Sequence, residues 1–171
     1  MQTRLGFEVL NFKRFEDERG YFQEWYHENG NFVPVQGNKS VSRLNTIRGI
    51  HLSKPGINQQ KLVSCVTGSI LDVVVNLRLH DINFGKYHAI KLNSQESKSI
   101  FIESGMGHAF ISLEPQTTVV YLTDALYSPD NEIALNPFDA EIGIEWNTTS
   151  PIVSKKDLEA MSLVEFKAQF S

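Results

Sequence analysis

Apolar and polar positions alternate over short stretches along most of the chain, a pattern typical of β-strands. Runs rich in β-branched and aromatic residues predict strands over residues 7–15, 21–26, 61–66, 69–79, 87–92, 98–104, 108–113 and 117–122. Turn sequences such as NSQES, EPQT and SPDN separate several of these runs. Strands that recur about every 8 to 12 residues are typical of a β-sandwich or barrel.

Two stretches add to this outline. Residues 73–75 are too continuously apolar for a surface strand, so we expect that strand to be covered on both faces. A helical pattern is present at the C-terminus, where residues 155–170 follow the capping candidate Ser154, and a short helix is also conceivable over residues 27–31. With no linker or internal repeat, residues 1–171 are predicted to form a single all-β domain with a short C-terminal helical tail.

Composition and charge exclude several classes of protein. The chain has 171 residues, 41% of them hydrophobic, so it can bury a core without a metal or disulfide. Its net charge is −4 and its basic residues are not clustered, which argues against a dedicated nucleic-acid binder. The first residues do not read as a secretory signal, and the sequence contains no run of about 18 apolar residues that could span a membrane. We therefore expect a cytoplasmic protein.

The only cysteine is Cys65, which rules out an internal disulfide and a cysteine-based zinc site. It lies in the apolar run KLVSCVTGSILDVVV, and we interpret it as a small buried hydrophobic residue rather than a reactive thiol.

Histidines are the first candidates for chemistry. His51 and His108 lie in β-rich segments, whereas the other three, at positions 27, 80 and 88, lie among polar residues and are expected at the surface. Polar residues that include Arg48 and Lys61 flank His51 in the sequence, and Tyr121 ends an apolar run. A base and a phenol on a β-scaffold would suit acid–base chemistry in the mouth of a barrel, although a single strand histidine is commonly only a core residue.

A metal site is the alternative for the same histidines. Small β-barrel oxygenases and isomerases usually bind their metal through two histidines separated by one residue, a nearby Glu and a third histidine. The segment GMGHAF around His108 resembles the strand that supplies the third ligand, but Leu52 and Ser53 follow His51, and no Glu occurs between His51 and Glu96. Two imidazoles without a carboxylate make a poor site for a divalent cation, so no metal is predicted.

Eight segments then resemble one known family. In order, they are DERGYFQE, QGNKSVSRLNTIRGIH, QQKLVSCVTGSILDVVVNLR, GKYHAIKL, ESGMGHAF, VVYLTDALYSPDNE, IGIEW and VSKKD. Together they resemble the dTDP-4-dehydrorhamnose 3,5-epimerases from about residue 5 to residue 160. The resemblance implies a cupin-like jelly-roll barrel that acts as a homodimer, without a cofactor, on a nucleotide-linked 4-keto-6-deoxyhexose. It also implies a role in rhamnose and O-antigen biosynthesis.

The resemblance also implies roles for individual residues. His51 occupies the position of the base that removes the protons next to the ketone, and Asp157 that of the carboxylate that orients this base. Lys61 matches the cation beside the C4 oxygen, and Tyr121 matches the phenol that returns a proton from the opposite face of the sugar. Proton removal and return are redox neutral, so this chemistry requires neither a metal nor a nicotinamide.

A second set of residues matches substrate-binding positions. Arg19 and Phe22 resemble an N-terminal arm that crosses to the partner subunit and contacts the diphosphate and the thymine. The other matching positions are Glu24, Gln36, Asn38, Arg48 and Tyr127 around the nucleotide and sugar, and Asp72 and His108 as buried polar residues beside the base. The simpler interpretation of Arg19 is a surface salt bridge with Asp17 or Glu18.

The sequence departs from the family's usual pattern around the pocket. Residues 52–56 read LSKPG where an aromatic residue, a Gln and a Pro pair are usual, and Ala109 and Asn76 also differ from the usual Gly and Asp. These changes leave the reaction class better defined than the substrate. A 3- or 5-mono-epimerase on a related nucleotide sugar, a metal-dependent cupin dioxygenase or isomerase, and a non-catalytic sugar-nucleotide binding module remain alternatives.

Overall fold

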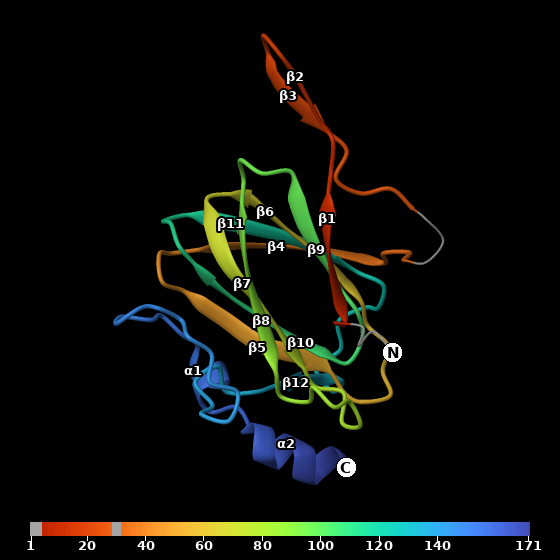
Figure 1. Cartoon of the computed structure of the whole chain (residues 1–171), viewed down its shortest axis with the longest axis vertical. Coiled ribbons are helices and arrows are strands. Elements are labelled where there is room, and N and C mark those ends of the chain that lie inside the picture. Colours follow the sequence, from red (N-terminus) through yellow and green to blue (C-terminus); the bar gives the residue numbers. More distant parts are fainter. Residues whose placement is uncertain (1–4, 29–31) are drawn as a thin grey trace.

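The computed structural model describes residues 5–28 and 32–171, which fold mainly into antiparallel β-strands (Figure 1). In spatial order, the first sheet contains β1 (Phe7–Asn11), β9 (Lys98–Ile102), β6 (Lys61–Thr67), β11 (Thr117–Thr123) and β4 (Gln36–Ser42). The second contains β12 (Glu132–Ala134), β5 (Ile47–Ser53), β10 (Met106–Ser112), β7 (Ser69–Asn76) and β8 (Tyr87–Asn93). The two sheets form the predicted cupin-like β-barrel.

Strand β7 shows how the sheets are covered. Val73 and Val75 belong to an apolar cluster that includes Phe166 of the C-terminal region, whereas Val74 belongs to a cluster that draws residues from both sheets. All three valines are fully buried. The prediction that residues 73–75 are covered on both faces is therefore confirmed. Cys65 is also buried, and this burial raises the pKa of its thiol to about 11, in line with its interpretation as a hydrophobic residue.

The C-terminal tail is helical as predicted, but it consists of two helices rather than one. Helix α1 (Lys155–Leu158) begins at Ser154, whose side chain accepts a hydrogen bond from the backbone N–H of Asp157. Helix α2 (Leu163–Phe170) begins at a second cap, Ser162, which forms a capping box. Between them Met161 pairs with the chain near β12, so its backbone is not available to a continuous helix.

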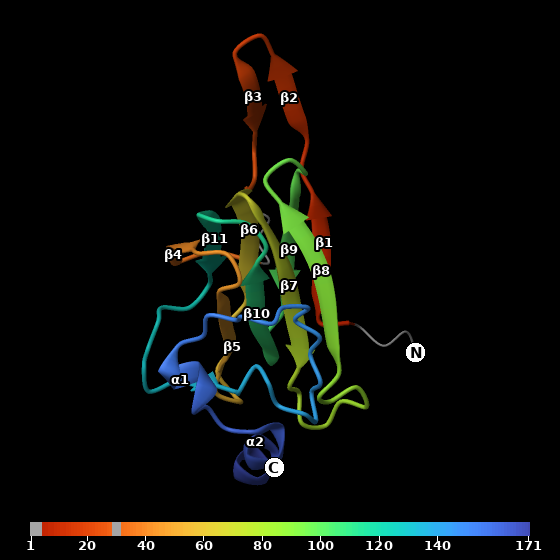
Figure 2. The same cartoon turned by 90° about the vertical axis from the view of Figure 1, so that its left-hand side faces the viewer.

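A short hairpin extends from the barrel near its N-terminus. The predicted strand over residues 7–15 is divided between β1 and β2 (Arg14–Asp17), and β2 pairs with β3 (Gly20–Gln23). Figures 1 and 2 show this hairpin projecting beyond the sheets at the end opposite to α1 and α2. Of the short helix considered over residues 27–31, His27 and Glu28 are not helical, and residues 29–31 lie outside the described residues.

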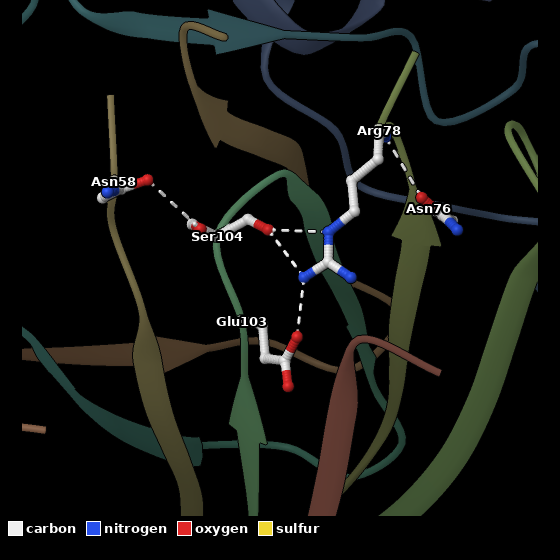
Figure 3. Close-up of polar contacts among 5 residues, drawn as sticks. All are labelled: Asn58, Asn76, Arg78, Glu103 and Ser104. Carbon is white, nitrogen blue, oxygen red and sulfur yellow. Dashed lines mark hydrogen bonds and ion pairs between the residues drawn. The ribbon is translucent and has the colours of Figure 1, made fainter. Parts of the chain in front are cut away.

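The loop that leads into β10 is fastened by Arg78. Its Nε and Nη2 atoms donate hydrogen bonds to the carbonyl oxygen of Ser104 at 3.1 and 3.0 Å, and Nη2 lies 2.7 Å from Oε2 of Glu103 (Figure 3). The loop is thereby fixed immediately before the strand that carries His108. Within residues 5–28 and 32–171, no helix is long and apolar enough to span a membrane.

Candidate active site

A cavity of about 550 Å³ opens between the two sheets and is closed on one side by α1. Its wall contains six of the residues singled out from the sequence, namely Arg48, His51, Lys61, His108, Tyr121 and Asp157. These residues come from β5, β6, β10, β11 and α1, so segments distant in the sequence meet at one place.

His51 and Asp157 form a hydrogen-bonded pair at the cavity wall. Nε2 of His51 lies 2.7 Å from Oδ1 of Asp157, with the His51 side chain 30% exposed and that of Asp157 only 7% exposed. Burial opposes ionisation of Asp157, but contacts from His51, and hydrogen bonds from Ser154 and Gly49, outweigh it and lower the pKa of the carboxyl. A carboxylate in this position can orient the imidazole and stabilise its protonated form.

An irregularity in β5 brings Arg48 and His51 to the same cavity. The register between β5 and β10 shifts between His108 and Phe110, whose partners on β5 are His51 and Arg48. Gly49 occupies the displaced segment with φ of 102°, and a side chain there would collide with the backbone carbonyl of His108. Glycine is therefore required where the strand turns the imidazole into the cavity.

A second His–Asp pair lies directly beside the first. His108 is opposite His51 in the strand register, and its Nε2 lies 2.8 Å from Oδ2 of Asp72. The side chain of Asp72 is fully buried, and within the described part of the chain its Oδ1 has no hydrogen-bond partner. His108 reaches the cavity wall, whereas Asp72 lies behind it.

Lys61 and Tyr121 supply a cation and a phenol to the same cavity. Burial lowers the pKa of the Lys61 ammonium to about 8, although the negative charges of Glu132 and Asp72 act in the opposite direction. Burial raises the pKa of the Tyr121 hydroxyl, and the charge of Glu132 raises it further. At neutral pH the cavity thus contains a charged lysine and a protonated tyrosine.

Two charged residues of this wall, Glu132 and Lys156, were not selected from the sequence. Nζ of Lys156 lies 2.5 Å from Oε2 of Glu132, and both side chains line the cavity. They are in the segments SPDNE and VSKKD, which were noted for family resemblance, but nothing local in those segments indicates that the two charges pair across 24 residues.

Three predicted substrate-binding residues lie close to the cavity without lining it. The Oε1 atom of Gln36 accepts a hydrogen bond from the backbone N–H of Tyr127 at 2.7 Å, and its Nε2 donates to Oδ1 of Asn38 at 2.8 Å. Asn38 lies opposite Tyr121 in the strand register. Tyr127 borders a small neighbouring cavity that Lys61 also borders. These residues therefore cluster on the β4 side of the site.

The remaining three predicted residues are on or beside the projecting hairpin and do not line the cavity of their own chain. Arg19 pairs with Asp17 at 2.6 Å, as in the simpler interpretation of this residue. Glu24 pairs with His27 at 2.9 Å, and Phe22 is 71% exposed. Within the described residues, no group of three or more His, Cys, Asp or Glu side chains could hold a metal ion.

Known proteins provide a comparison for this geometry. A family model described as dTDP-4-dehydrorhamnose 3,5-epimerase matches residues 5–165. The dTDP-4-dehydrorhamnose 3,5-epimerase of Mycolicibacterium smegmatis is 39% identical over 160 residues, which cover 89% of this chain and 79% of that protein. The dTDP-4-dehydrorhamnose 3-epimerase of Streptomyces niveus is 33% identical over 156 residues, covering 87% of this chain and 75% of the relative.

A solved structure extends the comparison to three dimensions. NovW, a 4-keto-6-deoxy sugar epimerase from the novobiocin biosynthetic gene cluster of Streptomyces spheroides, superimposes with a TM-score of 0.93 at 30% sequence identity. The superposition covers 99% of this chain and 88% of NovW. The likeness therefore includes both sheets and α1, which together enclose the cavity.

Proposed function

The chain belongs to the dTDP-4-dehydrorhamnose 3,5-epimerase family, a family of isomerases, and we propose that it epimerises a dTDP-linked 4-keto-6-deoxyhexose. The substrate we propose is dTDP-4-dehydro-6-deoxy-D-glucose, with dTDP-4-dehydro-L-rhamnose as the product. The observation that supports this reaction is the His51–Asp157 pair, which shares one cavity with Lys61 and Tyr121.

In the proposed mechanism, neutral His51 removes a proton from a carbon next to the ketone. Because Nε2 of His51 contacts Asp157, Nδ1 carries the lone pair that accepts this proton. The electron pair of the broken C–H bond moves to the C4 oxygen and forms an enolate, which the Lys61 ammonium stabilises. Tyr121 then donates its phenolic proton to the same carbon from the opposite face, and solvent reprotonates the tyrosine while removing the proton from His51.

The hairpin residues enter the proposal through a second copy of the chain. Arg19 and Phe22 do not line their own cavity, and the hairpin that carries them projects beyond the sheets (Figure 2). Strand β1 is moreover an edge strand, which a neighbouring chain can pair with or cover. We therefore propose a homodimer in which residues 19–24 of each subunit complete the partner's site. An active monomer, detected by sedimentation at micromolar concentration, would refute this arrangement.

NMR spectroscopy in deuterium oxide with dTDP-4-keto-6-deoxyglucose tests the proposed reaction. Deuterium at both C3 and C5 is the expected result. Deuterium at C3 alone would identify a 3-mono-epimerase, an alternative favoured by the similarity to the Streptomyces niveus 3-epimerase. Absence of label at both carbons would contradict the proposed substrate or activity.

The same measurement separates proton removal from proton return. We expect Tyr121→Phe to retain exchange while inversion is strongly reduced, because this variant keeps the proposed base but lacks the proposed acid. If Tyr121→Phe loses exchange and inversion to the same degree as a variant without His51, the assignment of the two faces is wrong.

A further inference from the structure

Glu132 shares its cavity with the groups that the proposed mechanism requires to be protonated. It is on β12, opposite Ser53 of β5, and its side chain lines the main cavity together with Lys61 and Tyr121. The small neighbouring cavity is also bordered by both Glu132 and Lys61. The Glu132 side chain is 22% exposed, so its charge acts largely within the protein rather than through water.

The position of the Glu132 carboxylate is set by Lys156. This lysine is adjacent in sequence to Asp157, and its Nζ lies 2.5 Å from Oε2 of Glu132. Lys156 is well exposed, with 62% of its side chain accessible, so solvent screens its positive charge more than that of the partly buried Lys61. The ion pair thus fixes the position of the Glu132 carboxylate without placing a second buried ammonium beside Lys61.

We propose that Glu132 is a positioning residue whose carboxylate, held by Lys156, keeps Lys61 in its protonated form. This inference rests on the proposed function for its purpose, since a charged lysine stabilises an enolate. The charge relationship itself is a property of the free protein and can be tested without substrate.

The other charged groups around Lys61 do not duplicate this role. Asp72 on β7 is the second carboxylate that raises the pKa of Lys61, but its Oδ2 atom lies 2.8 Å from Nε2 of His108. Asp157 on α1 is paired with His51. The remaining ionisable groups of the wall are Arg48 on β5, His108 on β10, Tyr121 on β11 and Lys156 on α1, none of which is an anion at neutral pH. Glu132 is therefore the cavity-lining carboxylate, within the described residues, that has no histidine partner.

Two variants that break the same ion pair separate charge from structure. Glu132→Gln removes the anion and Lys156→Met removes the cation, so each loses the 2.5 Å contact. If the contact served only to hold α1 against β12, both variants would change the site alike. If the Glu132 charge maintains the protonation of Lys61, the two variants must affect the Lys61 pKa differently.

The Lys61 pKa can be measured directly in the substrate-free protein. Trace acylation with acetic anhydride reaches only the neutral amine, and mass spectrometry reports the labelling of Lys61 relative to an added reference amine at each pH. Starting from about 8, we expect the midpoint to fall by about one pH unit in Glu132→Gln, and not to fall in Lys156→Met. The alkaline limb of the pH profile of kcat/KM should likewise shift to lower pH in Glu132→Gln and not in Lys156→Met.

The possible results distinguish the role of Glu132 from the proposed function. An unchanged midpoint in Glu132→Gln, or an equal decrease in both variants, would overturn the role of Glu132, even if the wild-type protein is an active epimerase. A decrease confined to Glu132→Gln supports that role. If this decrease is found but no substrate proton exchanges with solvent, the proposed function fails while the charge relationship stands.

Discussion

Two neighbouring His–Asp pairs, one lining the cavity and one reaching it only through its histidine, differ little in length but greatly in surroundings. His51 and Asp157 are 2.7 Å apart, and His108 and Asp72 are 2.8 Å apart. The His51 side chain is 30% exposed, whereas that of His108 is 10% exposed. Asp157 is on a short helix that closes the cavity, whereas Asp72 is on β7 in the second sheet and fully buried. The same chemical groups thus form one pair at the wall and a second pair whose carboxylate lies behind it.

This difference separates a group that can exchange protons with a substrate from one that supports the site. A base must reach the substrate and tolerate a change of charge, which the exposure of His51 and the low pKa of Asp157 both favour. The buried carboxylate of Asp72 instead constrains the His108 ring through their hydrogen bond. The following changes test this division.

The largest effect is expected from removal of His51. His51→Asn should abolish deuterium exchange at C3 and C5, because no other side chain is assigned as a base. His108→Asn is the matched substitution in the neighbouring pair and should retain measurable exchange. If exchange is lost in His108→Asn but kept in His51→Asn, the assignment of the base is reversed.

A smaller loss is expected when the imidazole remains and its carboxylate partner is neutralised. Asp157→Asn keeps the shape of the side chain but cannot stabilise the protonated imidazole as well, so kcat should fall by roughly 10²- to 10⁴-fold. Steady-state kinetics across a range of pH would measure this decrease. Full activity in Asp157→Asn would remove the dyad assignment and make Asp72 the better candidate.

The contrast between the two pairs also shows what could be learned from the sequence. Alternation and β-propensity are local properties, so most strands were predicted, although polar β4 and the three-residue β12 were not, and β5 was indicated only as the β-rich segment around His51. His51 and Asp157 are 106 residues apart, and only resemblance to a family connected them. Glu132 and Lys156 were missed because their pairing depends on how α1 packs beside β12, which no local pattern specifies.

The buried pair should matter more for stability than for exchange. His108→Gln leaves the buried Asp72 carboxylate without its present partner, and removing the partner of a buried hydrogen-bonding group typically costs about 1–3 kcal/mol in the free energy of unfolding. His51→Gln should cost less, because Asp157 retains contacts with Gly49 and Ser154. Urea unfolding of both variants provides the measurement. Equal losses would show that the difference in burial has no energetic consequence.

The smallest effect should come from the charge of Asp72 acting on Lys61. Its negative charge raises the pKa of Lys61 less than that of Glu132 does, and the contact with His108 partly offsets it. Asp72→Asn should therefore lower the labelling midpoint of Lys61, and by less than Glu132→Gln does. His108→Gln is the control, because it alters the same pair and keeps the carboxylate, so its midpoint should not fall. A decrease in Asp72→Asn as large as that in Glu132→Gln would mean that the buried pair contributes as much as the cavity wall to the charge of Lys61.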